Sequence, residues 1–95
     1  MSHEKYIPYR NKKILETARG EFCQLCGRYD GTIVAAHSNL LQDGKGVGKK
    51  SDDCFIAFLC YVCHVGYDRH KISQEDFHLA MKRTWKILLT KGILK

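Results

Sequence analysis

Two pairs of cysteines carry the clearest chemistry in this sequence. The first pair is Cys23 and Cys26, and the second is Cys60 and Cys63. Two residues separate the members of each pair, a spacing that presents two sulfur atoms to one tetrahedral ion. The four thiolates therefore predict a structural zinc site. Residues 27–59 separate the pairs, which is more than a simple zinc ribbon holds, so we expect further structure between them.

Two other uses of the cysteines are weaker interpretations. Disulfides need an oxidising compartment, but the N-terminus is polar without a secretory signal, and the fifth cysteine, Cys54, would be left over. We interpret Cys54 as an ordinary buried residue because it begins an apolar run. A thiol redox protein would place one pair among alternating strands and helices, and no such pattern surrounds either pair. A reducing cytoplasm is the expected location.

Size and charge limit the remaining possibilities. A chain of 95 residues predicts one domain with a small core, which a structural zinc would stabilise by about 10–16 kcal/mol. Lys and Arg number 16 against 10 Asp and Glu, and the net charge is +6. This balance favours a polyanionic partner such as nucleic acid over charge that serves solubility alone. No apolar run is long enough to predict a membrane span.

Turn signals and apolar periodicity predict the elements that position the cysteines. Residues 1–9 are expected to form an N-terminal arm, and residues 10–95 a single domain. The expected elements are a helix over 10–19 that ends at Gly20, a strand over 32–37, a loop over 38–53, a strand over 54–60 and a helix over 61–69. Strands and helices in this order predict an α+β fold with a β-hairpin and flanking helices.

The last helix is predicted most clearly. Ser73 opens it, Asp76 completes a capping box, and Gly92 ends it. Its apolar residues repeat at helical spacing, so we expect that face to pack on the core. These residues are Phe77, Ala80, Met81, Trp85, Leu88 and Leu89, with Thr84 between them.

Two histidines stand where predicted elements begin or end. His37 ends the first strand, and His64 follows the second cysteine pair on a different side of the helix from the thiol. Asp68 lies one turn after His64 on the same face, so it could bind a metal or orient His64. The alternative is a surface pair with Arg69 or Lys71. We interpret the remaining histidines as surface residues without a metal role: His3, His70 and His78.

The predicted loop over 38–53 combines glycines with lysines. It does not match a nucleotide-binding P-loop, because Asp43 and Lys50 occupy positions that need glycine and a hydroxyl residue. A basic loop that contacts a nucleic-acid backbone and a solvated linker are equally good interpretations. The lysines expected to contact phosphates without reading sequence are Lys45, Lys49 and Lys50 in the loop and Lys86 on the last helix.

The order of strand, long loop, strand and helix resembles the ββα-metal fold of the HNH nuclease superfamily. The likeness rests on Ala36-His37, Asp53 and Cys60-x-x-Cys63-His64. A narrower likeness, over about Lys13 to Lys95, is to small phage and prophage nucleases related to the recombination-enhancing nuclease called Ref. It rests on Val34–His37, the glycine-lysine loop, Leu59–Asp68, Arg83-Thr84-Trp85 and Lys91-Gly92-Ile93.

The resemblance implies a zinc-stabilised endonuclease that nicks DNA during phage recombination or DNA processing in the bacterial host cytoplasm. DNA would be the partner, together with recombination proteins bound to it. His37 matches the family's general base and His64 its helix-borne metal ligand. Imidazole suits the base role because its pKa lies near neutral pH. Asp53 stands near the family's asparagine, with Asp52 as a local alternative.

The second metal would be a catalytic divalent ion. His64 and Asp68 are its expected ligands, Asp53 is a further candidate, and Asn39 could orient a ligand. Mixed imidazole, carboxylate and water ligation accepts Mg or Mn, and also Ni or Zn. Ala36 departs from the family, because many members have a metal-binding His or Asp there. The alternative function is therefore a catalytically inactive, zinc-stabilised module that binds DNA or protein.

Overall fold

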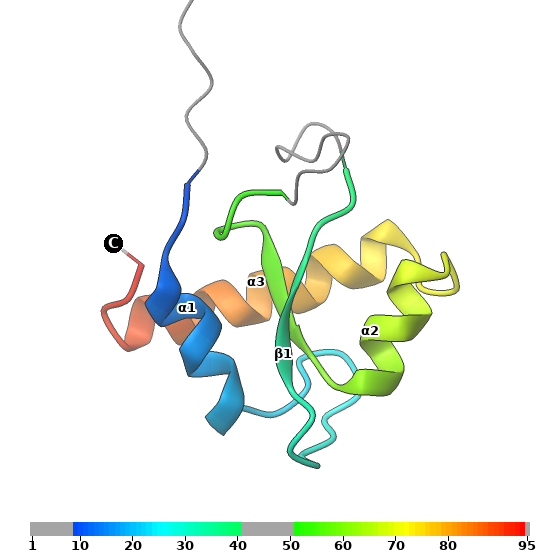
Figure 1. Ribbon diagram of the computed structural model, residues 1–95, viewed down its shortest axis with the longest axis horizontal. Coiled ribbons are helices and arrows are strands. Elements are labelled where there is room, and N and C mark those ends of the chain that lie inside the picture. Colours follow the sequence, from blue (N-terminus) through cyan, green and yellow to red (C-terminus); the bar gives the residue numbers. More distant parts are fainter. Residues whose placement is uncertain (1–8, 41–50, 95) are drawn as a thin grey trace, which may run out of the picture.

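A computed structural model describes residues 9–40 and 51–94. Its elements are helix α1 (Lys12–Thr17), the 3-10 turn η1 (Ala18–Gly20), strands β1 (Val34–His37) and β2 (Ile56–Leu59), and helices α2 (Tyr61–Asp68) and α3 (Gln74–Thr90). The strands lie at the centre, α3 crosses behind them, and α1 and α2 flank them (Figure 1). The described residues thus form a small α+β fold, as the sequence predicts.

The two strands form an antiparallel hairpin with a defined register. Val34 pairs with Leu59 at one end, and His37 pairs with Ile56 at the other. All four residues of β2 are buried, which explains why its sequence is apolar without alternation. Both strands are shorter than predicted. Thr32 lies outside β1 because its backbone N–H and its hydroxyl bond to the carboxylate of Asp30, which forms a local turn.

Helix α3 packs against β2 through most of the predicted apolar face. Phe77, Ala80, Met81 and Leu88 are buried, which confirms that face. The prediction was wrong for Leu89, which is 55% exposed at the edge of the stripe.

Two half-buried residues also depart from the expected core. Trp85 is half-buried, and its indole N–H donates to the carbonyl of Cys54 at 2.6 Å. Cys54 is itself half-buried, so the expectation of an ordinary core residue was wrong. The apolar run that it begins is buried only from Ile56 onward.

Polar and aromatic contacts fix how α3 lies on the hairpin. The backbone N–H of Phe58 in β2 donates to the buried hydroxyl of Thr84 at 3.0 Å, and that hydroxyl donates to the carbonyl of Ala80 at 2.8 Å. The rings of Tyr67 and Phe77 stack with their centroids 4.0 Å apart, joining α2 to α3. These contacts hold β2 and α2 against α3.

The helix ends follow local sequence signals, with one exception. Ser73 accepts from the N–H of Asp76, and Gly92 ends α3 at φ +72°, as predicted. Asn11 caps α1, so this helix begins later than expected. Helix α2 ends with His70 in the left-handed region at φ +58°. None of the helices in the described ranges has the length and apolar character needed to cross a lipid bilayer.

Candidate metal centre and histidine site

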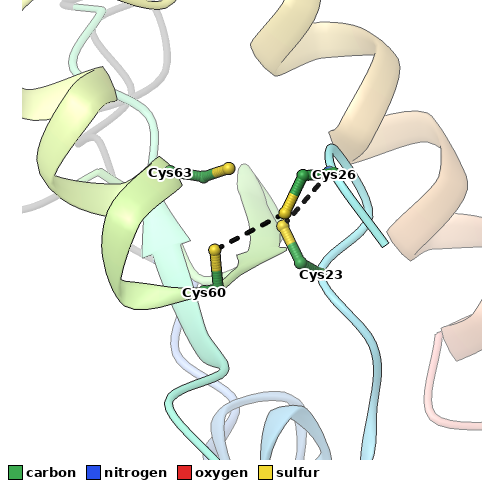
Figure 2. A group of neighbouring side chains, drawn as sticks. All are labelled: Cys23, Cys26, Cys60 and Cys63. Atoms are coloured by element: carbon green, nitrogen blue, oxygen red, sulfur yellow. Dashed lines mark hydrogen bonds between the residues drawn. The ribbon is translucent and has the colours of Figure 1, made fainter. Parts of the chain in front are cut away.

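The four predicted cysteines converge on one point (Figure 2). Their sulfur atoms lie within 4.8 Å of one another, and Cys26 Sγ is 3.7 Å from Cys60 Sγ. Four sulfurs placed about 2.3 Å from a tetrahedral zinc lie about 3.8 Å apart, so this spacing fits the ion. All are free thiols and form no disulfide. The cluster is compatible with a structural metal such as zinc.

The first cysteine pair sits in a tight turn that its backbone closes. The N–H of Cys23 donates to the carbonyl of Arg28 at 2.8 Å, and the N–H of Gly27 donates back to the carbonyl of Cys23 at 2.9 Å. Gly27 has φ +80°, a conformation that favours glycine. The N–H of Gln24 donates to the carbonyl of Phe58 at 2.8 Å and anchors this turn to β2.

The second pair belongs to the start of α2. Cys60 is the N-cap residue and Cys63 lies in the first turn, so both sulfurs project from the same side. The N–H of Tyr61 donates to Thr32 Oγ1 at 2.9 Å, which ties the helix start to the segment before β1. The N-terminal end of a helix carries partial positive charge, which favours thiolates at these positions.

The thiols differ in how readily they lose a proton. Burial raises the pKa of Cys63, and the three neighbouring thiols raise it further. Partial burial also raises the pKa of Cys26. Burial acts in the same direction on Cys23, but backbone N–H donors of Cys26, Cys60 and Leu25 outweigh it and lower the pKa to about 7. Cys23 therefore becomes a thiolate more readily than Cys26 or Cys63, and a bound cation would favour loss of the proton from these two as well.

His37 forms a close pair with Asp53. Its Nε2 lies 2.8 Å from Oδ1 of the carboxylate, and the side chains are 17% and 3% exposed. The N–H of Asn11 donates to Oδ2 of Asp53 at 2.7 Å, and the Arg10 guanidinium lies 3.6 Å from Oδ1. The N–H of Asp53 donates to the carbonyl of Tyr9 at 2.9 Å. Residues before α1 thus hold the carboxylate against the histidine.

The carboxylate that pairs with His37 belongs to Asp53 and not to its neighbour Asp52. Asp52 is buried nearby, and its carbonyl accepts from the N–H of Phe55 at 3.0 Å. Ser38 and Ser51 are buried as well. The interpretation of residues 38–53 as a solvated linker is therefore wrong for the described ends of that loop. Its predicted phosphate-contacting lysines, Lys45, Lys49 and Lys50, lie outside the described residues.

His64 and Asp68 form a second pair on α2. Their closest atoms, Nε2 and Oδ2, are 3.4 Å apart on the exposed face of the helix. The predicted one-turn relation is confirmed. Across the described residues, the four cysteines are the one group of three or more potential ligand side chains close enough to share an ion. His37 and His64 therefore lie outside that group, each paired with one carboxylate.

Asn39 joins three elements just after β1. Its backbone N–H donates to the hydroxyl of Tyr67 at 3.0 Å, and that hydroxyl donates to Oε1 of Gln74 at 3.0 Å. The side-chain amide of Gln74 donates back to Oδ1 of Asn39. This ring of hydrogen bonds uses the Asn39 amide to hold the start of the loop against α2 and α3.

Lys86 lines a cavity of about 460 Å³ between α3 and the segment around the first cysteine. Arg83 and Lys91 line it too, and Glu21 and Gln24 face them from the other side. Lys91 Nζ lies 2.9 Å from Glu21 Oε2, and Arg83 donates to the carbonyl of Gln24 at 3.0 Å. The wall of this cavity carries three cations and one carboxylate.

Sequence reasoning missed four residues: Arg10 and Asn11, which hold Asp53, and Tyr67 and Gln74, which hold Asn39. The bond from Asn11 to Asp53 spans 42 positions, and no periodicity or spacing reports such a contact. Of these, only the burial of Tyr67 could have been predicted, because Tyr67 lies one turn after Cys63 on the buried side of α2.

Comparisons with known protein families, curated proteins and solved structures find no match for this chain. Its function therefore has to follow from the chemistry of its own side chains. Three features bear on that function: the cysteine cluster, the two histidine–carboxylate pairs and the basic cavity.

Proposed function

We propose that the chain is a zinc-stabilised endonuclease of the HNH, or ββα-metal, type that nicks DNA with the help of a divalent ion. The observation that carries the proposal is the pair of His37 with the buried Asp53, whose atoms lie 2.8 Å apart at the end of β1. The order β1, β2 and α2, with His64 on the helix, supports it.

The His37–Asp53 pair suits a general base. A carboxylate only accepts hydrogen bonds, so Nε2 of His37 carries the hydrogen that faces Asp53. Nδ1 then keeps its lone pair and can take a proton from a water molecule. The water oxygen attacks phosphorus as that proton leaves, and the bond from phosphorus to the leaving oxygen breaks.

His64 and Asp68 are the proposed ligands of the divalent ion. Imidazole and carboxylate with water accept Mg or Mn, and also Ni or Zn. Such an ion would neutralise charge on the phosphate and the leaving oxygen. Asp53 is a weaker candidate ligand, because its two oxygens already bind His37 and Asn11. Following the resemblance, we place this activity in phage DNA recombination or processing, in a bacterial host cytoplasm with recombination proteins on the DNA.

A catalytically inactive binding module is the second candidate. It is favoured by Ala36, which is buried and offers no ligand where many HNH enzymes have one. It is also favoured by the ligand groups of the described residues: the four cysteines are close enough to share an ion, and neither histidine pair belongs to such a group. Such a module would use the zinc cluster as a scaffold and bind DNA or protein without turnover.

A plasmid-nicking assay separates the two candidates. Zinc-loaded protein would be incubated with supercoiled plasmid in the presence and absence of Mg or Mn. We expect nicking that requires the added ion and that His37→Ala abolishes. The matched control is His78→Ala, a partly buried histidine on α3 outside both pairs. Omission of the ion is a better control than EDTA, because EDTA also extracts zinc from thiolates.

Each outcome decides the proposal. Nicking by wild type and by His78→Ala, but not by His37→Ala, supports the endonuclease. A zinc-loaded wild-type protein that shifts the plasmid on a gel and never cuts it with either ion supports the binding module. Equal nicking by wild type and His37→Ala removes His37 from the chemistry and overturns the proposed mechanism.

A further inference from the structure

Two aromatic rings stand exposed beside the cysteine cluster. Phe22 immediately precedes Cys23 and is 56% exposed, and Tyr29 follows the first cysteine turn and is 60% exposed. Their ring centroids lie 4.8 Å apart with the planes tilted by 43°. Rings that pack on each other while more than half of each faces water form a small surface suited to stacking.

The basic cavity begins in the same segment. Glu21 and Gln24 line it, and Phe22 lies between them in the sequence. The amide of Gln24 donates to the carbonyl of Phe22 at 2.8 Å, so the two surfaces share one piece of backbone. In the described part of the chain, Lys86 has no acidic partner, whereas Lys91 pairs with Glu21. The cavity therefore keeps an excess of positive charge next to the rings.

We propose that these two surfaces together bind an unpaired stretch of nucleic acid. Bases would stack on Phe22 and Tyr29, and the phosphates would follow Arg83 and Lys86 along the cavity. Proteins that bind single strands without reading sequence combine aromatic platforms with a basic groove in this way. The proposal deepens the proposed endonuclease, on which it rests for its biological meaning, by naming an unpaired stretch of nucleic acid as the part of the substrate that these surfaces hold.

Charge and ring type together favour nucleic acid over a protein partner. An apolar protein partner would be served equally by aliphatic residues and would gain nothing from the neighbouring cations. A polyanion with flat bases uses both features, and the net charge of +6 attracts it. Arg28, beside Tyr29, adds a further exposed cation, although Asp30 lies 3.8 Å from it.

Fluorescence anisotropy with a labelled oligonucleotide tests the proposal. The zinc-loaded protein would be titrated into a single-stranded DNA, the same sequence as single-stranded RNA, and its duplex DNA, without added Mg or Mn so that nothing is cut. The test variants are Phe22→Leu and Tyr29→Leu, which keep apolar bulk but remove the ring. Tyr29→Phe keeps the ring, and Leu89→Ala is the control for an exposed apolar residue on α3.

We expect single-stranded DNA or RNA to bind more tightly than the duplex. Each ring-removing variant should weaken single-strand binding by about tenfold, the effect of losing one stacked base, while Tyr29→Phe and Leu89→Ala should bind like wild type. Lys86→Gln should lower the slope of log affinity against log salt by about 0.7, the contribution of one phosphate contact on a single strand. Zinc content of one ion per chain confirms that each variant is folded.

Three results would overturn the proposal. The first is single-strand binding that Phe22→Leu and Tyr29→Leu leave unchanged. The second is equal loss of duplex and single-strand binding in these variants. The third is a wild-type dimer that Phe22→Leu converts to a monomer without affecting oligonucleotide binding, which would assign the rings to contact between two copies. Because no cleavage is measured, failure here leaves the nicking assay and the proposed endonuclease standing.

Discussion

At the scale of single residues, Asp53 connects parts of the chain that are far apart in sequence. Its Oδ1 atom lies within hydrogen-bond distance of Nε2 of His37, and its Oδ2 atom accepts from the backbone N–H of Asn11. The carboxylate therefore fixes both the orientation of the imidazole and the nitrogen that carries its hydrogen. An amide in its place could donate as well as accept, and would permit the opposite tautomer.

Asp53→Asn should therefore lower the nicking rate by about 10²- to 10⁴-fold, because Nδ1 would no longer be held as the free base. Single-turnover nicking across a range of pH would measure the effect. Asp30→Asn, on an exposed turn, is the matched control and should nick like wild type. An Asp53→Asn protein of normal zinc content and normal nicking rate would show that this carboxylate does not position the base.

The thiols predict how zinc affinity depends on pH. The pKa values of Cys26 and Cys63 are raised in the folded structure, and the thiols of an unfolded, metal-free chain also hold their protons at neutral pH. Zinc binds thiolates and displaces these protons, so binding weakens as pH falls. With at least these two protons displaced, apparent affinity should drop by at least about 100-fold per pH unit. Competition with a chromophoric chelator between about pH 6 and pH 8 would measure it, and a pH-independent affinity would contradict it.

At the scale of elements, two helices end in the same backbone motif with different residues. After α3, Gly92 has φ +72°, and the N–H of Ile93 donates to the carbonyl of Leu88 at 2.9 Å. After α2, His70 has φ +58°, and the N–H of Lys71 donates to the carbonyl of Gly66 at 2.8 Å. Glycine adopts this conformation freely, whereas histidine pays a steric penalty.

His70→Gly should therefore stabilise the zinc-loaded protein by about 0.5–1 kcal/mol, after allowing for the greater freedom of glycine in the unfolded chain. Gly92→Ala is the reciprocal change and should destabilise by about 1 kcal/mol. Urea denaturation of both variants measures the two effects. A lower midpoint for His70→Gly would mean that the exposed imidazole makes a contact worth more than the strain.

The same pair of helix ends shows what sequence can and cannot predict here. Gly92 allowed the end of α3 to be predicted from the sequence, whereas a histidine gives no indication that it will adopt the left-handed conformation. The cysteine cluster, the hairpin, α2 and α3 follow from spacing and periodicity, which are local. The exposure of Leu89, the choice of Asp53 over Asp52 and the role of Asn11 depend on contacts between distant segments. The roles of His37 and His64 in catalysis stay predictions.

At the scale of the whole molecule, we expect a metal in the cysteine cluster to supply stability that the small hydrophobic core does not. The buried residues gather around β2 and one face of α3, and a chain this short can bury only a small core. Single domains are stable by only about 5–15 kcal/mol, and structural zinc contributes free energy of the same order. Folding is thus expected to depend on the metal.

Zinc removal should unfold the chain. A strong chelator should abolish the tertiary signal of Trp85 and the cooperative thermal transition, and re-addition of zinc should restore them. Cys60→Ser should have the same effect as the chelator, because it removes a ligand at the start of α2. Cys54→Ser is the matched control, and it should keep one zinc per chain and the transition. A folded, zinc-free Cys60→Ser protein would contradict this expectation.

The position of the cysteines relative to the hairpin also determines how folding and metal loading are coupled. Cys26 and Cys60 are 34 positions apart, and bringing such positions together costs about 3 kcal/mol in chain entropy. The pairing of Val34 with Leu59 closes most of the same loop, so most of this entropy is lost once for both events. Loading should therefore be all-or-none: a titration with substoichiometric zinc should yield only empty unfolded and fully loaded folded molecules, with no hairpin that lacks the ion.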